Sequence, residues 1–241
     1  MDEQFTDPDL ARWYDALCAG RRDFDFYLPL VLAAPAVLDV GCGTGELLHL
    51  ARAAGHPGRL CGLDPAAEML AVARERPDIE VEWVHGDLTT STWDAEFDLV
   101  VMTGHAFQEL VTDDQVRTAL AGIHRALRPR GRFAFETRNP GARAWESWTP
   151  DRSREVTRGS TTLRVGHDAT ADGDLVRFTT TYTADTGDRR TSASTLRFLD
   201  HPALVESLTA AGFAVERQFG DWDRSPLTAG SPEIITIART G

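Results

Sequence analysis

The sequence predicts an α/β protein with a doubly wound, mostly parallel sheet. Apolar runs alternate with helical patterns through roughly the first 140 residues, as in repeated β-α units. A glycine-rich turn, "DVGCGTGEL", follows the first apolar run and opens a helix. From about residue 153 the helical period stops, and alternating stretches separated by Gly and Asp predict an antiparallel insertion. We therefore expect a main domain over 1–150 and 200–241, and a β insertion over 151–199.

Each element of the main domain has its own signal. Five strands are predicted, over 36–40, 59–64, 81–87, 97–103 and 131–137. The fourth is nearly continuously apolar, as expected of a central parallel strand. Helical spacing between them predicts helices over 46–54, 65–76 and 112–127. Thr112 and Gln115 form a capping-box pair at the start of the third helix. A last helix over 203–212 and two strands, "FAVERQF" and "EIITIAR", close the chain.

Composition excludes several classes of function. The chain has 241 residues, a formal net charge of -12 and no lysine, which rules out Schiff-base chemistry on the protein and a P-loop lysine. No basic patch stands out, so we expect no nucleic-acid partner. Three scattered cysteines predict neither a disulfide framework nor a metal site. The first residues lack the pattern of a signal peptide and no apolar run is long enough to cross a membrane, so a cytoplasmic protein is expected.

The glycine-rich turn predicts a ligand site at the carboxyl edge of the sheet. Its spacing is G-x-G-x-G rather than the G-x-G-x-x-G of pyrophosphate-binding turns. Asp39 and Glu46 flank it, which favours a ligand that carries positive charge or hydroxyl groups. Asp64 and Asp87 end the next two strands, where acids can bind a ribose and an adenine amino group. Each acid alone can equally be a helix N-cap.

In these motifs, "VLDVGCGTGEL", "GLDPAAEML", "VHGDL", "FDLVVMTGHAFQEL" and "LRPRGRFAFET", the sequence resembles class I S-adenosylmethionine-dependent methyltransferases. The resemblance implies a Rossmann-like sheet of order 3-2-1-4-5-7-6 with S-adenosylmethionine as cofactor. It places the methionine part against Gly41 and Gly43, the ribose on Asp64, and the adenine between Asp87 and Leu88. A helical segment over 11–27 would close over the cofactor. The cofactor-binding residues implied are Tyr14, Arg22, Asp39, Gly41, Cys42, Gly43, Asp64, Pro65, Met69, Gly86, Asp87, Leu88, Thr103 and Gly104.

Candidate acceptor residues follow the fourth and fifth strands. His105 lies where the methyl group should point, as a general base or as a group that positions substrate. Glu109 either binds a polar substrate or faces solvent. Trp145 and Trp148 either wall an organic substrate or anchor the insertion on the sheet. The predicted substrate-binding residues are His105, Gln108, Arg138, Asn139, Trp145, Trp148 and Tyr182.

The predicted function is methyl transfer from S-adenosylmethionine to an O or N atom of a small organic molecule by direct SN2 displacement. The insertion over 151–199 would act as the substrate lid. The family's Asn-Pro-Pro-aromatic motif and the clustered acids and lysine of metal-dependent members are absent, so no metal is expected. Two alternatives stay open: a methyltransferase acting on a macromolecule, and a protein that binds the sulfonium without transferring its methyl group. The oligomeric state is open as well.

Overall fold

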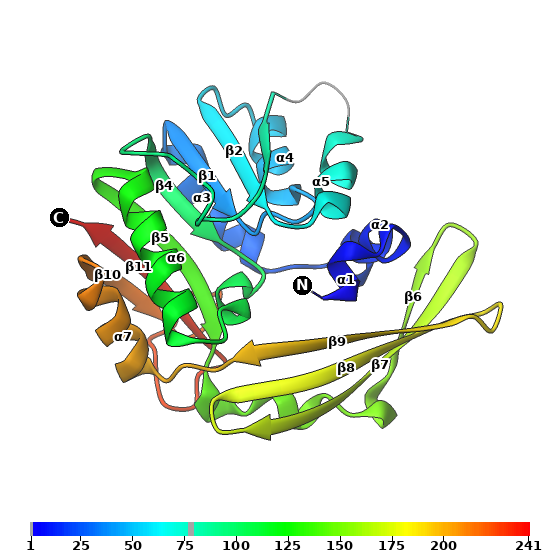
Figure 1. Ribbon diagram of the computed structural model, residues 1–241. Coiled ribbons are helices and arrows are strands. Elements are labelled where there is room, and N and C mark those ends of the chain that lie inside the picture. Colours follow the sequence, from blue (N-terminus) through cyan, green and yellow to red (C-terminus); the bar gives the residue numbers. More distant parts are fainter. Residues whose placement is uncertain (1, 77–79) are drawn as a thin grey trace.

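The computed structural model describes residues 2–76 and 80–241 (Figure 1). The main sheet contains seven strands: β1 (Ala36–Val40), β2 (Arg59–Asp64), β3 (Glu82–His85), β4 (Phe97–Met102), β5 (Leu127–Arg138), β10 (Phe213–Phe219) and β11 (Glu233–Thr240). Their order is β10-β11-β5-β4-β1-β2-β3. The pairs from β3 to β5 are parallel, whereas β11 is antiparallel to β5 and β10. The predicted α/β fold and strand order are confirmed, because β10 and β11 are the sixth and seventh strands of this sheet along the chain.

Helices cover both faces of the main sheet. On one face, α3 (Asp23–Ala33) and α4 (Glu46–Ala53) bury apolar side chains against β1, β2 and β4. On the other, α6 (Asp113–Ala126) and α7 (His201–Ala210) pack on β1, β4 and β5. All five residues of β1 are buried, and four of them are apolar; Asp39 is the exception. The predicted capping box of α6 is present: Gln115 N donates to Thr112 Oγ1 over 3.2 Å.

A second, four-stranded sheet is formed by β6 (Arg154–Arg158), β7 (Thr161–Asp172), β8 (Leu175–Ala184) and β9 (Arg189–Arg197). Its strands follow chain order and all its pairs are antiparallel. The described chain also has four short 3-10 helices. One follows β4, η1 (Ala106–Glu109), and three lie between β5 and β6: η2 (Pro140–Ala142), η3 (Ala144–Ser147) and η4 (Pro150–Arg152). No helix in the described part of the chain is long and apolar enough to span a bilayer.

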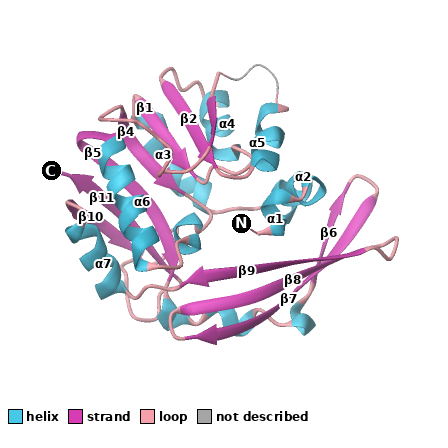
Figure 2. Cartoon of the chain, in the orientation of Figure 1, coloured by secondary structure: helices cyan, strands magenta, loops and turns pink. Residues whose placement is uncertain are grey.

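The N-terminal helices α1 (Glu3–Thr6) and α2 (Pro8–Leu17) lie between the two sheets, next to α5 (Ala67–Arg74) (Figures 1 and 2). Arg190 of β9 forms an ion pair with Asp7 at 2.5 Å, at the start of α2. Arg12 of α2 forms another with Glu75 at 2.5 Å, at the end of α5. These contacts tie the second sheet to the half of the main domain that carries the glycine-rich turn.

Candidate functional site

The glycine-rich turn after β1 uses its three glycines in two different ways. Gly41, Gly43 and Gly45 all have left-handed backbone, with φ of +72°, +56° and +69°. Gly41 and Gly43 line a cavity of about 1190 Å³, which we call the main cavity. Gly45 does not line it; a Cβ there would lie 2.1 Å from Cη2 of Trp83. The first two glycines therefore expose backbone to a ligand, whereas the third makes room for a tryptophan.

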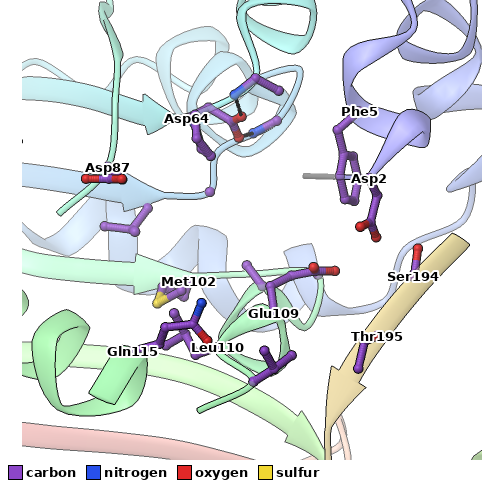
Figure 3. Close-up of a pocket in the computed structure, with 18 of the residues that line it drawn as sticks. Asp2, Phe5, Asp64, Asp87, Met102, Glu109, Leu110, Gln115, Ser194 and Thr195 are labelled. Carbon is purple, nitrogen blue, oxygen red and sulfur yellow. Dashed lines mark hydrogen bonds between the residues drawn. The ribbon is translucent and has the colours of Figure 1, made fainter. Parts of the chain in front are cut away.

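Asp64 ties the turn after β1 to the start of α5. Its Oδ2 accepts a hydrogen bond from Gly43 N over 2.7 Å, and its Oδ1 accepts one from Ala66 N over 2.8 Å (Figure 3). Burial raises the pKa of this carboxyl, although the two backbone N–H groups oppose that rise. An ionised carboxylate has about four lone-pair sites, so Asp64 can accept two further hydrogen bonds from a ligand.

The wall beyond Asp64 comes from the ends of β2, β3 and β4. Asp87 Oδ1 accepts hydrogen bonds from Thr89 N over 2.8 Å and Thr90 N over 3.1 Å, which hold the loop after β3. Hydrogen bonds, chiefly that from the Thr89 hydroxyl, lower the pKa of Asp87 and keep it ionised. The predicted cofactor residues that line the main cavity are Tyr14, Gly41, Gly43, Asp64, Pro65, Met69, Gly86, Asp87, Leu88, Thr103 and Gly104. They converge at the carboxyl edge, where α/β sheets bind ligands.

A smaller cavity of about 20 Å³ lies beside the first and corrects one prediction. Asp39, Cys42 and Tyr14 line it together with Arg21. The predicted Arg22 lies outside both cavities: its side chain is 64% exposed and lies 3.9 Å from Asp221. Arg21 is only 17% exposed and donates through Nε to Asp23 Oδ1 over 3.0 Å. The turn before α3 sends these neighbouring arginines in different directions, and Arg21 is the one that reaches the site.

Asp39 is a buried carboxylate with an unused acceptor. Its side chain is 1% exposed, and its Oδ1 has no hydrogen-bond partner among the described residues. Burial raises its pKa to about 7, against which the charge of Arg21 acts only in part. An ionisable group of this kind destabilises the folded chain when it is charged, and a ligand that carries positive charge or donates a hydrogen bond would relieve it.

Replacing Asp39 by asparagine should stabilise the ligand-free protein above neutral pH. In wild type the carboxyl ionises at about 7 when folded against 3.8 when unfolded, so folding holds an extra proton between these values and stability falls as pH rises through them. The interval corresponds to on the order of 4 kcal/mol. Thermal unfolding followed by circular dichroism should show D39N more stable than wild type at pH 8 and nearly equal at pH 4. The same difference at both pH values would contradict the assignment.

His105, predicted as general base and substrate ligand, does not lie on the wall of either cavity. Its Nε2 lies 3.0 Å from Oε2 of Glu233 on β11, and its backbone N donates to Glu136 Oε1 over 2.7 Å. Burial lowers the pKa of His105 to about 3 and raises that of Glu233 to about 8, so both are held toward their neutral forms. His105 has a left-handed backbone, with φ of +64°, in the loop that follows β4.

Three other predicted substrate ligands are committed to contacts within the protein, and none lines the main cavity. Gln108 is 1% exposed; its Oε1 accepts from Arg138 Nη1 over 3.1 Å and its Nε2 donates to Arg197 O over 3.0 Å. The Arg138 guanidinium also lies over the Trp148 ring, 5.2 Å from its centroid. Asn139 Nδ2 donates to the carbonyls of Thr228 and Ala229, each over 3.2 Å. These side chains join β5 to the loops around it.

The predicted aromatic substrate ligands also lie outside the wall of the main cavity. Trp145 packs edge-on against Phe198 at 4.7 Å, and Trp148 against Phe178 at 5.1 Å, in an apolar cluster of the second sheet. Tyr182 is buried against α2, and its hydroxyl donates to Gln4 Oε1 over 3.0 Å. Of the two readings of the tryptophans, anchoring of the insertion is the one that the structure supports.

The far wall of the main cavity comes from residues that the sequence did not single out. They belong to the N-terminal helices, the loop after β4, α6 and the second sheet: Asp2, Phe5, Leu110, Val111, Asp114, Gln115, Thr118, Ala119, Asp168, Thr170, Arg177, Phe178, Thr179, Ala193, Ser194 and Thr195. Glu109, for which two readings were open, also lines the cavity. Strand alternation predicted β7 to β9 but not which of their faces would meet the main domain.

Comparisons with known proteins agree with this arrangement. Residues 37–131 match a family model described as a methyltransferase domain. The cypemycin N-terminal methyltransferase of a Streptomyces species is 29% identical, over 83% of this chain and 81% of its own. The dTDP-3-amino-3,6-dideoxy-alpha-D-glucopyranose N,N-dimethyltransferase of Streptomyces fradiae is also 29% identical, over 83% and 78%. A 2-phytyl-1,4-naphtoquinone methyltransferase of Thermosynechococcus vestitus is 39% identical, but the match spans only 41% of this chain and 44% of that relative.

Solved structures share the fold over nearly the whole chain. The CcbJ methyltransferase of Streptomyces caelestis superposes with a TM-score of 0.77 at 19% identity, covering 94% of this chain and 90% of its own. CalS10 of Micromonospora echinaspora, solved with its cofactor bound, gives a TM-score of 0.72 at 24% identity, covering 95% and 94%. Residues 37–131 therefore resemble a methyltransferase domain, and the whole chain shares its fold with solved methyltransferases.

Proposed function

We propose that this protein transfers a methyl group from S-adenosylmethionine to an O or N atom of a small organic molecule by direct SN2 displacement. The observation that carries the proposal is the size and position of the main cavity, about 1190 Å³ between the carboxyl edge of the main sheet and the second sheet. A pocket for one ligand typically measures about 300–1,000 Å³. The main cavity therefore has room for an acceptor beside the cofactor.

The residues at the carboxyl edge fit S-adenosylmethionine. Asp39 supports this fit, because its buried Oδ1 lacks a hydrogen-bond partner among the described residues and suits a ligand with an amino group. Gly41 and Gly43 would let the methionine part approach the backbone, and Asp64 would accept hydrogen bonds from the ribose hydroxyls. Met69 and Leu88 would pack on the adenine. When bound, the cofactor supplies an electrophilic methyl group, so the protein's task is to hold an acceptor in line with it.

The segments that close the cavity would position the acceptor and exclude water. In the proposed division, residues 1–150 and 200–241 bind the cofactor and 151–199 form the substrate lid. Phe178, Ser194 and Thr195 of the second sheet line the cavity, and α1 contributes Phe5. Holding two reactants in a near-attack arrangement can remove about 7–11 kcal/mol from a barrier. The names of the two relatives that align over most of their length support small or terminal acceptor groups.

Two measurements test the proposal. Mass spectrometry of the purified protein should find bound S-adenosylmethionine or S-adenosylhomocysteine. Incubation with S-adenosylmethionine and pools of small alcohols and amines should then form S-adenosylhomocysteine together with a methylated acceptor. Methylation only of intact proteins, peptides or nucleic acids would favour the macromolecular alternative. A cofactor that binds and stays intact with every acceptor pool would favour the non-transferring one.

A further inference from the structure

The lining of the main cavity carries more acidic than basic side chains. Its described lining includes one basic side chain, Arg177, and that guanidinium lies 3.4 Å from Asp172 and is 56% exposed. Six acidic residues line the same cavity: Asp2, Asp64, Asp87, Glu109, Asp114 and Asp168. Recognition of phosphate relies on several Arg or Lys donors or on helix N-termini, and negative charge on an acceptor would be repelled by this lining. The charge distribution favours a cationic acceptor.

Glu109 is the acid best placed to meet that acceptor. Glu109 is the last residue of η1, the short helix that follows Thr103 and Gly104 at the end of β4. Because Thr103 and Gly104 line the proposed cofactor side of the cavity, Glu109 lies next to that side. Figure 3 shows its carboxylate reaching into the open space toward Asp2 and Ser194, away from Asp64 and Asp87. Glu109 is exposed on the cavity wall, and its carboxylate has no hydrogen bond to the other described residues. Oδ2 of Asp2 is a buried oxygen that also lacks a partner among the described residues.

We propose that the methyl acceptor is an amine without phosphate groups, and that Glu109 binds its ammonium form and accepts its proton. This inference rests on the proposed function and narrows it. Desolvation by the surrounding cavity walls, followed by the charge of Asp2, raises the pKa of Glu109 to about 7, while Arg138 opposes the rise. Asp114, Asp168 and Arg177 are the other charged groups on the acceptor side. A base with a pKa near the working pH is suited to take a proton at neutral pH.

The bonds and protons of the methyl transfer balance with only the acceptor, the cofactor and Glu109. One N–H bond of the ammonium breaks, its proton moves to a carboxylate oxygen of Glu109, and the electron pair stays on nitrogen. That lone pair forms the new N–C bond while the S–C bond breaks and its electrons remain on sulfur. The product is a methylated ammonium, and Glu109 releases its proton to solvent. An alkyl hydroxyl holds its proton about as tightly as water, with a pKa near 15.7, so the same carboxylate is too weak a base for an alcohol.

Paired probes test the inference in the complex with S-adenosylhomocysteine, where no transfer occurs. Cyclohexylamine, cyclohexanol and cyclohexyl phosphate share one ring, and ligand-observed NMR titration gives their affinities. We expect the amine to bind wild type at least about 10-fold more tightly than the alcohol, and the phosphate to bind most weakly. E109Q should weaken amine binding by about 10- to 100-fold, as for loss of a charged hydrogen bond. Wild-type amine affinity should rise from pH 6 to pH 8 as Glu109 ionises, and that of E109Q should stay flat.

The matched control is E155Q, which makes the same chemical change on β6, where the side chain is 64% exposed and outside the cavity. It should keep the preference for the amine. Equal binding of amine and alcohol to wild type, binding of neither, or an unchanged preference in E109Q would overturn the inference. Titration of S-adenosylhomocysteine alone is a separate readout: if that compound fails to bind, the proposed function itself is wrong.

Discussion

Replacing Asp64 by asparagine is expected to weaken the binding of S-adenosylhomocysteine by about 100-fold or more. The carboxylate already accepts hydrogen bonds from Gly43 N over 2.7 Å and Ala66 N over 2.8 Å, and its remaining lone pairs face the main cavity. An amide has a single oxygen, so its NH₂ group would point either at a backbone N–H or at the ribose. Each hydrogen bond to a charged group contributes about 1.5–3 kcal/mol, and D64N would lose or weaken two of them toward the ligand.

Isothermal titration calorimetry of the folded variant measures this effect directly. The control is D188N, the same substitution in the exposed turn between β8 and β9, outside the main cavity. It should bind S-adenosylhomocysteine as wild type does. If D64N binds within threefold of wild type while remaining folded, the ribose does not depend on Asp64 and the cofactor lies elsewhere in the cavity.

Replacing Gly45 by alanine should destabilise the protein by about 2–5 kcal/mol. Two effects add: the residue has φ of +69°, and its new Cβ would lie 2.1 Å from Cη2 and 2.6 Å from Cζ3 of Trp83. A left-handed alanine costs about 1–2 kcal/mol, and overpacking costs a further 1–3 kcal/mol. Because Gly45 does not line the main cavity, the loss should appear in the free energy of unfolding.

Gly55, at the other end of α4, separates the two effects. It also has positive φ, of +85°, but a Cβ there meets nothing within 4 Å. G55A should therefore cost only the dihedral part, about 1–2 kcal/mol. Urea unfolding of both variants gives the comparison, and shortening Trp83 to leucine in the G45A background should recover part of the loss. If G45A proves no more destabilising than G55A, the contact with Trp83 has no energetic weight.

Short-range signals brought most of the predicted cofactor-binding residues to the wall of the main cavity, and Arg22 is an exception. Asp64 and Asp87 end adjacent parallel strands, so knowing that the strands are parallel is enough to bring the two acids to one edge. Arg21 and Arg22 mark the limit of this reasoning, since they are neighbours in a turn and no periodicity distinguishes them. Only the packing of α3 against β1 and β4 shows that Arg21 points inward, 3.4 Å from the Thr103 hydroxyl.

The acceptor side depended on tertiary structure to a much greater extent. His105, Gln108 and Trp148 are residue types that often bind substrates, yet each contacts a segment distant in sequence. A side chain's direction on a strand reverses with a shift of one residue in register, and such a shift leaves the sequence pattern unchanged. The alternation of β7 to β9 was therefore visible in the sequence, while the face that carries Phe178, Ser194 and Thr195 into the cavity was not.

The sequence by itself determined the fold class and placed the glycine-rich turn and the two acids at one edge of the sheet. These depend on periodicity and on the topological rule that parallel strands end together, while the strand order followed from the resemblance to methyltransferases. Only the tertiary structure decided that Gly45 accommodates Trp83, that His105 faces Glu233, and that Glu109 opens into the cavity. The physical reason is that these outcomes depend on side-chain packing between segments far apart in the chain, which local patterns do not encode.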